Sequence, residues 1–382
     1  MTMGSRSHAF RVGISGSYGG LNLGDEAILE AIITQLRRAL PVEIVVFSRD
    51  PHDTLQRHRI EHAVPVRQLT RAEARAEIEQ LDVFVLGGGG FLYDNEAEEY
   101  LREAFLAYEA GVPVVVYAIS AGPLHHRSTR GAVRDALNNA AIVTVRDRQA
   151  RKLLEDVGVE QDIQVTADPA LLLGCEPLAP DLLNREGLDT ERRLVGFSVR
   201  EPGPAAPDID VDHYHQLLAN AADFMVDRLD ADIVFVPLER RHMDMQHSHA
   251  VVAQMQCVQR ATVLKGEYTP RQLLTLVGHF EFSVGMRLHF LIFCALQNVP
   301  FVALPYASKV TDLLKDLEME MPPLYHVNTG RLLAAIDRSW DWRDSIRERI
   351  RRRLPGLQQR ALETNRLLVD LLVRDVASAQ ST

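Results

Sequence analysis

The clearest chemical signal lies where a strand predicted at 280–284 runs into a helix predicted at 287–296. Gly285 follows the strand, and Arg287 and His289 stand in the first turn of the helix. A helix dipole disfavours cations at its N-terminus, so this arrangement favours a bound anion near Arg287. The alternative interpretation of His289 is a capping or packing residue.

Two further cations stand at similar junctions. Arg200 follows a strand predicted over 194–199, and Lys309 follows a strand predicted over 301–304. Arginine presents a planar fork to a carboxylate or phosphate and lysine presents a point charge, so both indicate an anionic ligand. The alternatives are a local ion pair between Arg200 and Glu201, and an ordinary surface position for Lys309.

Three segments of the first half place glycine, serine and acidic residues behind predicted strands. Glycine lets a ligand approach the backbone closely, and the N–H groups at a helix start hold hydroxyls or anions. The first of these segments, at 16–26, is neither a Walker motif nor a clean dinucleotide fingerprint. A tight turn with dipole-stabilising acids is the alternative for that segment. The candidate substrate contacts are Gly19, Gly20, Asn22, Asp25, Glu26, Gly88, Gly89, Asp94 and Ser120.

One cluster of metal-binding residue types was considered. His242, Asp244, His247 and His249 fall within eight residues. Their spacing lacks the HExxH pattern, so we interpret the segment as a polar loop after a strand at 231–237. We expect neither a metal nor another cofactor.

Apolar runs alternate with helical patterns along both halves of the chain. Continuous Val/Ile/Leu runs separated by helices indicate parallel sheets covered on both faces. We therefore predict an α/β fold with two Rossmann-like, doubly wound domains facing a cleft, joined by a linker near 174–192. The expected divisions are an N-terminal domain at 1–175, a C-terminal domain at 190–345 and a helical tail at 346–382.

The individual elements follow from the same patterns, and Thr269 is expected to cap the helix that begins at Pro270. Strands are predicted at 11–16, 42–48, 81–86, 113–119, 142–145, 163–166, 194–199, 231–237, 280–284 and 301–304. Helices are predicted at 25–36, 100–110, 147–157, 214–229, 251–258, 269–279, 287–296, 310–317 and 343–376.

Composition narrows the class of protein. The chain has 382 residues, with 42 Lys and Arg against 52 Asp and Glu, giving a net charge of −10. This balance argues against a dedicated nucleic-acid or anionic-membrane binder. No apolar run approaches the roughly 18 residues of a spanning helix, and the N-terminus lacks a secretory h-region. With three dispersed cysteines, we expect a cytoplasmic protein.

The start of the C-terminal helix is rich in arginine. Between Arg343 and Arg360 there are seven arginines and two acids, interleaved with apolar residues. We interpret this segment as a solvated helix face, and the alternative is a basic docking patch.

In their order along the chain, several motifs resemble those of the polysaccharide pyruvyl transferase family. Each is weak alone, but the ordered set is specific and spans about 11–320. The matching pieces are YGGLNLGDEAIL at 18–29, LGGGGF at 86–91, VRD at 145–147, ADP at 167–169, GMRLH at 285–289 and YASK at 306–309. The ISAGP segment at 119–123 departs from the Gly-Gln-Gly pattern of many members.

This resemblance implies a GT-B-like fold and an enzyme that moves a pyruvyl group from phosphoenolpyruvate onto two sugar hydroxyls. The product is a cyclic ketal on a polysaccharide or its lipid-linked precursor, and phosphate is released. Arg200, Arg287 and Lys309 then hold the donor anion, and His289 acts as general acid. The glycine segments hold the acceptor sugar. The protein is expected to work in the cytoplasm, where peripheral contact with the inner membrane face is compatible with this role.

Two other classes stay open at this point. A GT-B glycosyltransferase needs a carboxylate for ribose hydroxyls after a late strand, where the sequence offers Asp312 but no clear glutamate. A non-catalytic sugar-binding relative predicts that Arg287 and His289 are dispensable.

Overall fold

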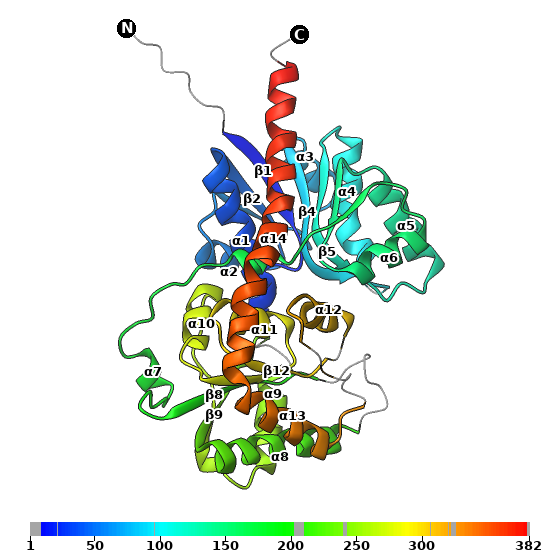
Figure 1. The fold of residues 1–382 in the computed structure, drawn as a ribbon. Helices are drawn as coiled ribbons and strands as arrows, with labels where there is room; N and C mark the ends of the chain where they lie inside the picture. The colour runs from blue at the N-terminus through cyan, green and yellow to red at the C-terminus, as the bar shows by residue number, and fades with distance from the viewer. Residues whose placement is uncertain are drawn as a thin grey trace. The chain divides into compact units, whose positions relative to one another are not determined.

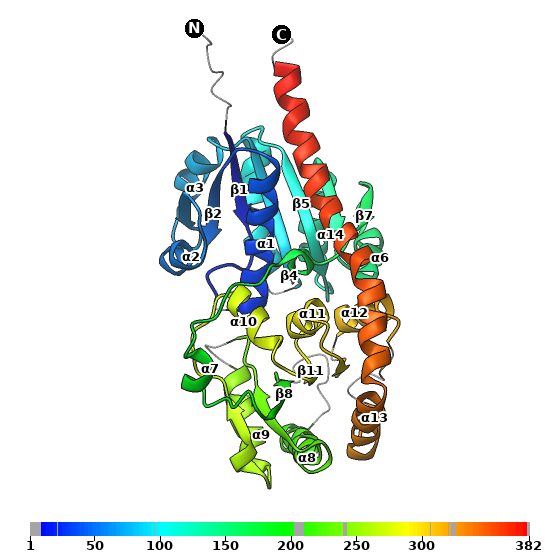
Figure 2. The ribbon, with the colours of Figure 1, turned by 60° about the vertical axis from the view of Figure 1, so that its left-hand side comes forward.

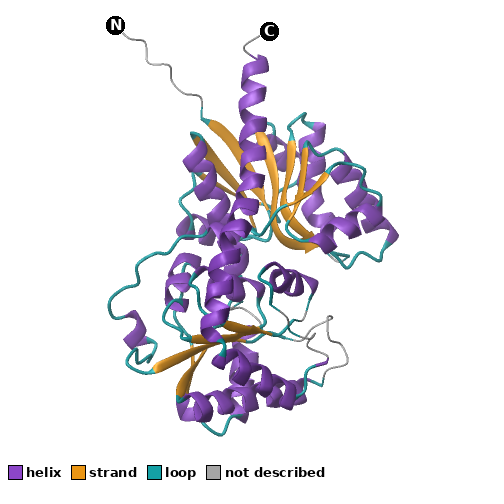
Figure 3. Ribbon diagram, in the orientation of Figure 1, coloured by secondary structure: helices purple, strands orange, loops and turns teal. Residues whose placement is uncertain are grey.

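The computed structural model describes residues 9–20, 22–94, 96–201, 210–239, 243–305, 307–319, 321 and 326–379. The chain forms two compact units, and the strands gather into one sheet in each (Figure 3). Unit 1 comprises Met1–Gly20, Asp25–Leu173 and Gln358–Thr382, and unit 2 comprises Leu21–Gly24 and Gly174–Leu357.

Unit 1 contains a seven-stranded parallel sheet in the order β3-β2-β1-β4-β5-β6-β7. Every residue of β2 from Ile44 to Ser48 is buried, as expected for a strand covered by helices on both faces (Figures 1 and 2). The strands are β1 (Phe10–Ser15), β2 (Val42–Ser48), β3 (His62–Pro65), β4 (Val83–Leu92), β5 (Val114–Ala121), β6 (Ile142–Val145) and β7 (Ile163–Val165).

The helices of unit 1 alternate with these strands, which gives the predicted doubly wound pattern. They are α1 (Leu23–Ala39), α2 (Pro51–Arg57), α3 (Arg71–Ile78), α4 (Ala97–Glu109), α5 (Arg127–Asn138) and α6 (Arg148–Val157), with the 3-10 turn η1 (Pro169–Leu172) after β7. The first residues of α1 are assigned to unit 2, so this helix is shared.

Unit 2 repeats the plan with five parallel strands in the order β10-β9-β8-β11-β12. Its strands are β8 (Arg193–Ser198), β9 (Ala231–Phe235), β10 (Ala261–Val263), β11 (Phe282–Gly285) and β12 (Phe301–Ala303). Its helices are α7 (Leu182–Arg185), α8 (Val211–Leu229), α9 (Asp244–Gln254), α10 (Pro270–Val277), α11 (Leu288–Leu296), α12 (Ser308–Asp316) and α13 (Thr329–Asp341), with the 3-10 turn η3 (Val258–Arg260) before β10.

The last helix, α14 (Arg343–Ala379), belongs to both units, because the division falls between Leu357 and Gln358. The tail expected at 346–382 is therefore not a separate body. In unit 1, Thr364 is fully buried, and its hydroxyl oxygen lies within hydrogen-bond distance of the Thr144 and Thr166 hydroxyl oxygens, at 3.2 and 3.0 Å. The buried apolar residues of this part of the helix are Ala361, Leu368 and Leu372.

The glycine run is not the loop that the sequence predicts. Gly87–Gly90 lie inside β4, which stays paired with β5 as far as Leu92 through an irregular register. Gly88 has a φ of +59°, and a Cβ atom there would lie 2.0 Å from the Ile28 side chain. The glycines thus form a bulge in a buried strand that larger residues could not enter.

A second correction concerns the histidine-rich segment. Residues from Asp244 onward form α9, so His247 and His249 lie on a helix and not in a polar loop. His242 lies outside the described residues. The misassignment has a physical cause: Asp244, His247 and Ser248 are polar but buried, so the apolar periodicity that marks a helix is weak here.

The described helices were also tested for membrane insertion. In this part of the chain, none combines the length and the apolar character needed to cross a bilayer.

The predicted cap of α10 is confirmed and yields a first test. The Thr269 hydroxyl accepts from the Gln272 N–H at 3.1 Å, and the Gln272 side chain accepts from the Thr269 N–H at 3.1 Å. We expect Thr269→Ala to destabilise the fold by about 1 kcal/mol, measured by denaturant unfolding. Thr269→Ser keeps the cap and should behave like the native protein. Equal losses in both variants would contradict a capping role.

Candidate functional site

In unit 2, the predicted cations gather behind three neighbouring strands. The order β8-β11-β12 puts these strands side by side, and their carboxyl ends share one sheet edge. Arg200 follows β8, Arg287 and His289 follow β11, and Lys309 follows β12. The strand order reverses between β8 and β11, which is where doubly wound sheets bind ligands.

Arg287 is the N-cap residue of α11 and is held by two carboxylates. Its Nε donates to Asp244 Oδ2 at 2.9 Å, and its Nη2 donates to Glu239 Oε2 at 2.7 Å. Its side chain is 12% exposed. The carboxylates of Asp244 and Glu239 thus supply part of the negative charge that the start of α11 favours. The guanidinium has a fixed orientation at the sheet edge.

Asp244, which we expected in a loop, holds both Arg287 and the backbone after β9 in place. It is fully buried, and its Oδ2 accepts the N–H groups of Leu238 and Glu239, both at 3.1 Å. It therefore fixes the backbone after β9 as well as Arg287. Asp244 follows β9, which is the neighbour of β8, and this position at the same sheet edge could have indicated its role in the site.

His289 lies in the first turn of α11, next to Gly24. A Cβ atom on Gly24 would lie 2.0 Å from His289 Nδ1, so only glycine lets the ring take this position. Asn22 Oδ1 accepts from the Gly24 N–H at 3.0 Å, and Leu23 N–H donates to Leu238 O at 2.9 Å. Asn22, expected in the acceptor half, thus belongs to unit 2.

The structure also places the other three predicted residues of unit 2. Arg200 Nε donates to the Glu201 carbonyl at 3.0 Å, and the Tyr214 hydroxyl donates to the Arg200 carbonyl at 2.7 Å. Gly285 allows close packing of α11, because a Cβ there would lie 2.6 Å from Phe290. Lys309 is half-buried in the first turn of α12; its neighbour Tyr306 lies outside the described residues.

A buried histidine pair lies behind this edge and was not predicted. His215 Nε2 and His247 Nδ1 are 2.7 Å apart. Burial and the neighbouring His247 lower the pKa of His215; burial also lowers the pKa of His247, opposed by Glu201. The pair is therefore neutral near pH 7, which suits a hydrogen bond between one imidazole N–H and the other ring nitrogen.

In unit 1, the strand order reverses between β1 and β4, and the glycine segments meet there. The hydroxyl of buried Tyr18 donates to the Gly87 carbonyl, and burial together with Asp25 and Glu26 raises the pKa of Tyr18. A Cβ on Gly89 would lie 3.4 Å from Asp25 Oδ1. The structure thus brings Asp25 to the predicted glycines.

Glu26 has a structural role. It is fully buried, its Oε1 accepts from the Gly19 N–H at 2.9 Å, and its Oε2 lies 2.8 Å from His58 Nε2. His58 Nδ1 lies 2.9 Å from Glu30. Glu26 therefore holds the turn at Gly19, next to half-buried Gly20, and is not positioned as a sugar contact.

Asp94 also has local partners. Its carboxylate accepts the N–H of His125 at 2.7 Å and that of His126 at 2.9 Å. Burial raises the pKa of Asp94 but these N–H donors lower it, and the net direction is down. Asp94 thus fixes the turn after β5, whatever else it contacts.

The VRD and ADP motifs supply residues that the sequence analysis did not assign. Arg146 and Asp168, after β6 and β7, form a buried ion pair at 2.7 Å. The Ser120 hydroxyl bonds to Asp147, whose other oxygen caps α6 through the Ala150 N–H at 2.7 Å. Arg146, Asp147 and Asp168 follow the adjacent strands β6 and β7, whereas Ser120 lies within β5, near its carboxyl end. The shared placement of the first three residues is the signal that was missed.

The carboxylate considered for a nucleotide ribose is also buried. Asp312 lies inside α12 at 5% exposure, with Lys315 at 3.6 Å. Among the residues that the structure describes, no three His, Cys, Asp or Glu side chains gather so as to hold a metal ion.

Solved structures define the class of fold. A UDP-GlcNAc 2-epimerase from Methanocaldococcus jannaschii matches with a TM-score of 0.60 and 12% identity, over 86% of this chain and 92% of that one. Anabaena HepE, solved with UDP and glucose, matches with a TM-score of 0.62 and 14% identity, over 95% and 99%. The chain therefore has a GT-B-like α/β fold of two doubly wound sheets, as predicted.

Sequence comparison defines the family. The family model "Polysaccharide pyruvyl transferase" matches residues 22–308. The amylovoran biosynthesis protein AmsJ of Erwinia amylovora is 21% identical over 308 residues, which cover 78% of this chain and 74% of that protein. The chain belongs to the polysaccharide pyruvyl transferase family, which confirms the predicted resemblance.

The Glu26–His58–Glu30 cluster predicts a pH dependence of stability. Burial lowers the pKa of His58, but its hydrogen bonds to the two glutamates outweigh this and raise it overall. A raised pKa stabilises the native state below the unfolded value, and that contribution is lost as the pH rises through the folded value.

We therefore expect the stability advantage of the native protein over His58→Gln to shrink as the pH rises above about 6.5, measured by urea unfolding. His52→Gln, at an exposed position, is the matched control and should follow the native protein at every pH. An advantage that grows with pH would contradict a charged His58.

Proposed function

We propose that this protein transfers the pyruvyl group of phosphoenolpyruvate onto two hydroxyls of a sugar, forming a cyclic ketal and releasing phosphate. The observation that carries the proposal is the gathering of Arg200, Arg287, His289 and Lys309 behind three neighbouring strands of one sheet. All but Lys309 lie within the span matched by the family model. The family membership supports a transferase acting on polysaccharide.

The donor is assigned to the sheet edge of unit 2. Phosphoenolpyruvate carries a carboxylate and a phosphate, for which Arg200 and Lys309 supply cations. The first N–H groups of α11 point along the helix axis and favour the same anion. Arg287, fixed by Asp244 and Glu239, orients the loop that presents these N–H groups and adds a guanidinium at its end.

The reaction needs an acid at the donor methylene. In the proposal, His289 gives a proton to C3 of the enol, which becomes a methyl group, while the first sugar hydroxyl bonds to C2. The proton of that hydroxyl returns to His289. The second hydroxyl then bonds to C2, the bond from C2 to the phosphate oxygen breaks, and the phosphate leaves with the remaining proton. Cations beside the phosphate stabilise the charge that develops on it.

The acceptor is assigned to the sheet edge of unit 1. The Asp25 carboxylate lies beside the bulge at Gly88 and Gly89, where the backbone can be approached closely. Ser120 lies near the carboxyl end of β5, and the Arg146–Asp168 pair follows β6 and β7 at the same edge. Neutral hydroxyls suit this mixture of carboxylates and backbone groups. We do not assign Glu26 to the acceptor, because it is buried with His58.

The donor assignment can be tested by ligand binding. We expect phosphoenolpyruvate to raise the melting temperature of the native protein, since a ligand that binds only the folded state stabilises it. Arg200→Ala and Lys309→Ala should each weaken binding about ten-fold or more, because each removes a charge-assisted contact. Lys152→Ala, at an exposed position of unit 1, is the control. Unchanged affinity in both site variants would refute the assignment.

A His289 variant can distinguish an effect on donor binding from an effect on the reaction. We expect His289→Gln to bind phosphoenolpyruvate as the native protein does, but to release phosphate about 10²–10⁴-fold more slowly with a panel of oligosaccharide acceptors. The measurements are calorimetry and a phosphate assay. Native turnover in this variant would exclude His289 as the acid, and lost binding with normal folding would make it a donor contact instead.

A further inference from the structure

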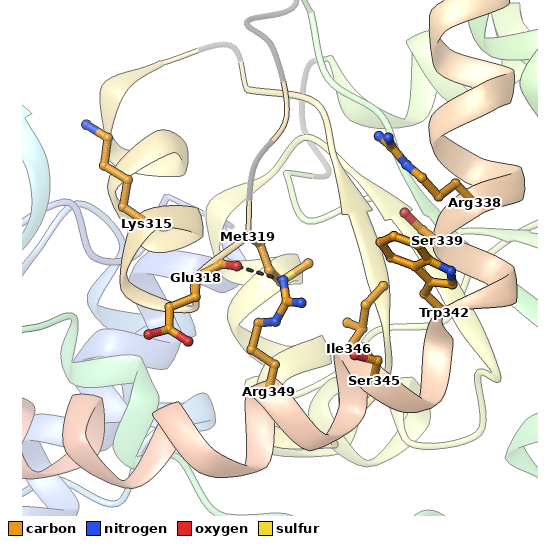
Figure 4. Close-up of a pocket in the computed structure, with 9 residues that line it drawn as sticks. All are labelled: Lys315, Glu318, Met319, Arg338, Ser339, Trp342, Ser345, Ile346 and Arg349. Atoms are coloured by element: carbon orange, nitrogen blue, oxygen red, sulfur yellow. Dashed lines mark hydrogen bonds between the residues drawn. The ribbon is translucent and has the colours of Figure 1, made fainter.

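A cavity in unit 2 lies outside the sheet edges described above. It has a volume of about 510 Å³ and is formed by the end of α12, α13 and the beginning of α14 (Figure 4). This volume is within the range of sites that bind small organic ligands. The lining residues are Lys315, Glu318, Met319, Arg338, Ser339, Trp342, Ser345, Ile346 and Arg349.

The lining includes two arginines, Arg338 and Arg349, that no carboxylate of the described residues neutralises, whereas Lys315 pairs with Asp312 at 3.6 Å. Arg349 donates to the backbone carbonyl of Glu318 at 2.7 Å, which fixes its guanidinium without an ion pair. The Glu318 carboxylate points to the other side (Figure 4), toward Arg352 at 2.6 Å. Within the described ranges, no carboxylate lies in ion-pair distance of Arg338 or Arg349.

The cavity also has a flat aromatic wall. Trp342 is 62% exposed, an unusual position for a large apolar side chain. In Figure 4 its indole lies between Arg338 and Ile346, and the hydroxyls of Ser339 and Ser345 lie nearby. An exposed indole offers a face on which a sugar ring can stack, and hydroxyls and guanidinium groups bind its polar substituents.

From this combination we infer that the cavity binds an anionic saccharide, with a sugar ring on Trp342 and its carboxylate or phosphate groups at Arg338 and Arg349. The inference rests on the proposed function in one respect, because a pyruvyl ketal leaves its product with a free carboxylate. The site would then hold product repeats of the polysaccharide away from the sheet edges. A nucleoside diphosphate shares this chemistry and is distinguished by the test.

A bilayer surface fits the cavity less well. Asp341, Asp344 and Glu348 are exposed and lie outside the cavity lining, so an extended anionic membrane surface would meet them whereas a ligand held in the cavity would not. Most arginines at the start of α14 are also engaged locally; for example, Arg347 pairs with Asp344 at 2.8 Å and Arg351 pairs with Glu348 at 2.6 Å. These pairs agree with the predicted solvated face, outside the cavity itself.

The test uses the two tryptophans of the chain. Trp340 is buried and contacted by Arg193 and Arg343, so Trp342 dominates any change of emission caused by a ligand. The full-length protein is titrated with oligogalacturonate, with a neutral galacto-oligosaccharide of equal length, with UDP, and with vesicles of anionic phospholipid. We expect a saturable emission change with oligogalacturonate alone, and none in Trp342→Phe.

Charge variants decide the remaining question. Arg338→Ala and Arg349→Ala should each weaken oligogalacturonate binding at least ten-fold, whereas Arg185→Ala, an exposed arginine of α7, should leave it unchanged. No binding, equal binding of the neutral saccharide, binding of UDP or vesicles only, or native affinity in both variants would overturn the inference. Arg338→Ala removes no ion pair of the described residues, so we expect this variant to fold like the native protein.

The same variants separate this inference from the proposed function. Arg338→Ala should keep the stabilisation by phosphoenolpyruvate, which depends on the sheet edge. If phosphoenolpyruvate fails to bind the native protein while oligogalacturonate binds as expected, only the donor assignment fails. The reverse pattern removes the saccharide site alone.

Discussion

Parallel strand pairing constrains where chemistry can arise in this protein. All the paired strands of both sheets run parallel, so every carboxyl end in a sheet faces the same edge. Residues far apart in sequence therefore meet at that edge without any local signal: Arg200 and Arg287 are brought together by the pairing of β8 with β11. The helices cover both faces of each sheet, and ligands of such folds bind outside the carboxyl ends of the strands.

Each edge is held by a buried pair of arginine and aspartate. In unit 2, Asp244 joins Arg287 to the backbone after β9, and in unit 1, Arg146 pairs with Asp168 across β6 and β7. Removing one partner of such a pair leaves a buried charge uncompensated, at a typical loss of about 3–5 kcal/mol. These pairs fix the loops in advance, so a ligand need not order them.

Much of the fold could be predicted, because buried strands and helices have apolar residues in recognisable local patterns. The strand at 42–48 is found at its predicted bounds, since its Val and Ile residues are buried on both faces. These local patterns do not show contacts between residues that are far apart in the sequence. Glu26 finds His58 through the tertiary structure, Asp244 is buried despite its charge, and the run Gly87–Gly90 continues a strand because β5 pairs with it. The sequence thus predicts which candidate residues stand near strand ends, but not the partners that they contact.

The order of the segments along the chain has a consequence for biosynthesis. Unit 1 includes Gln358–Thr382, which follows the main segment of unit 2 in the chain, and Thr364 from this segment is buried beside Thr144 and Thr166. The first sheet is therefore synthesised long before the helix that completes its core. Until that segment has been synthesised, the apolar surface that receives Ala361 and Leu368 must stay uncovered in the nascent chain.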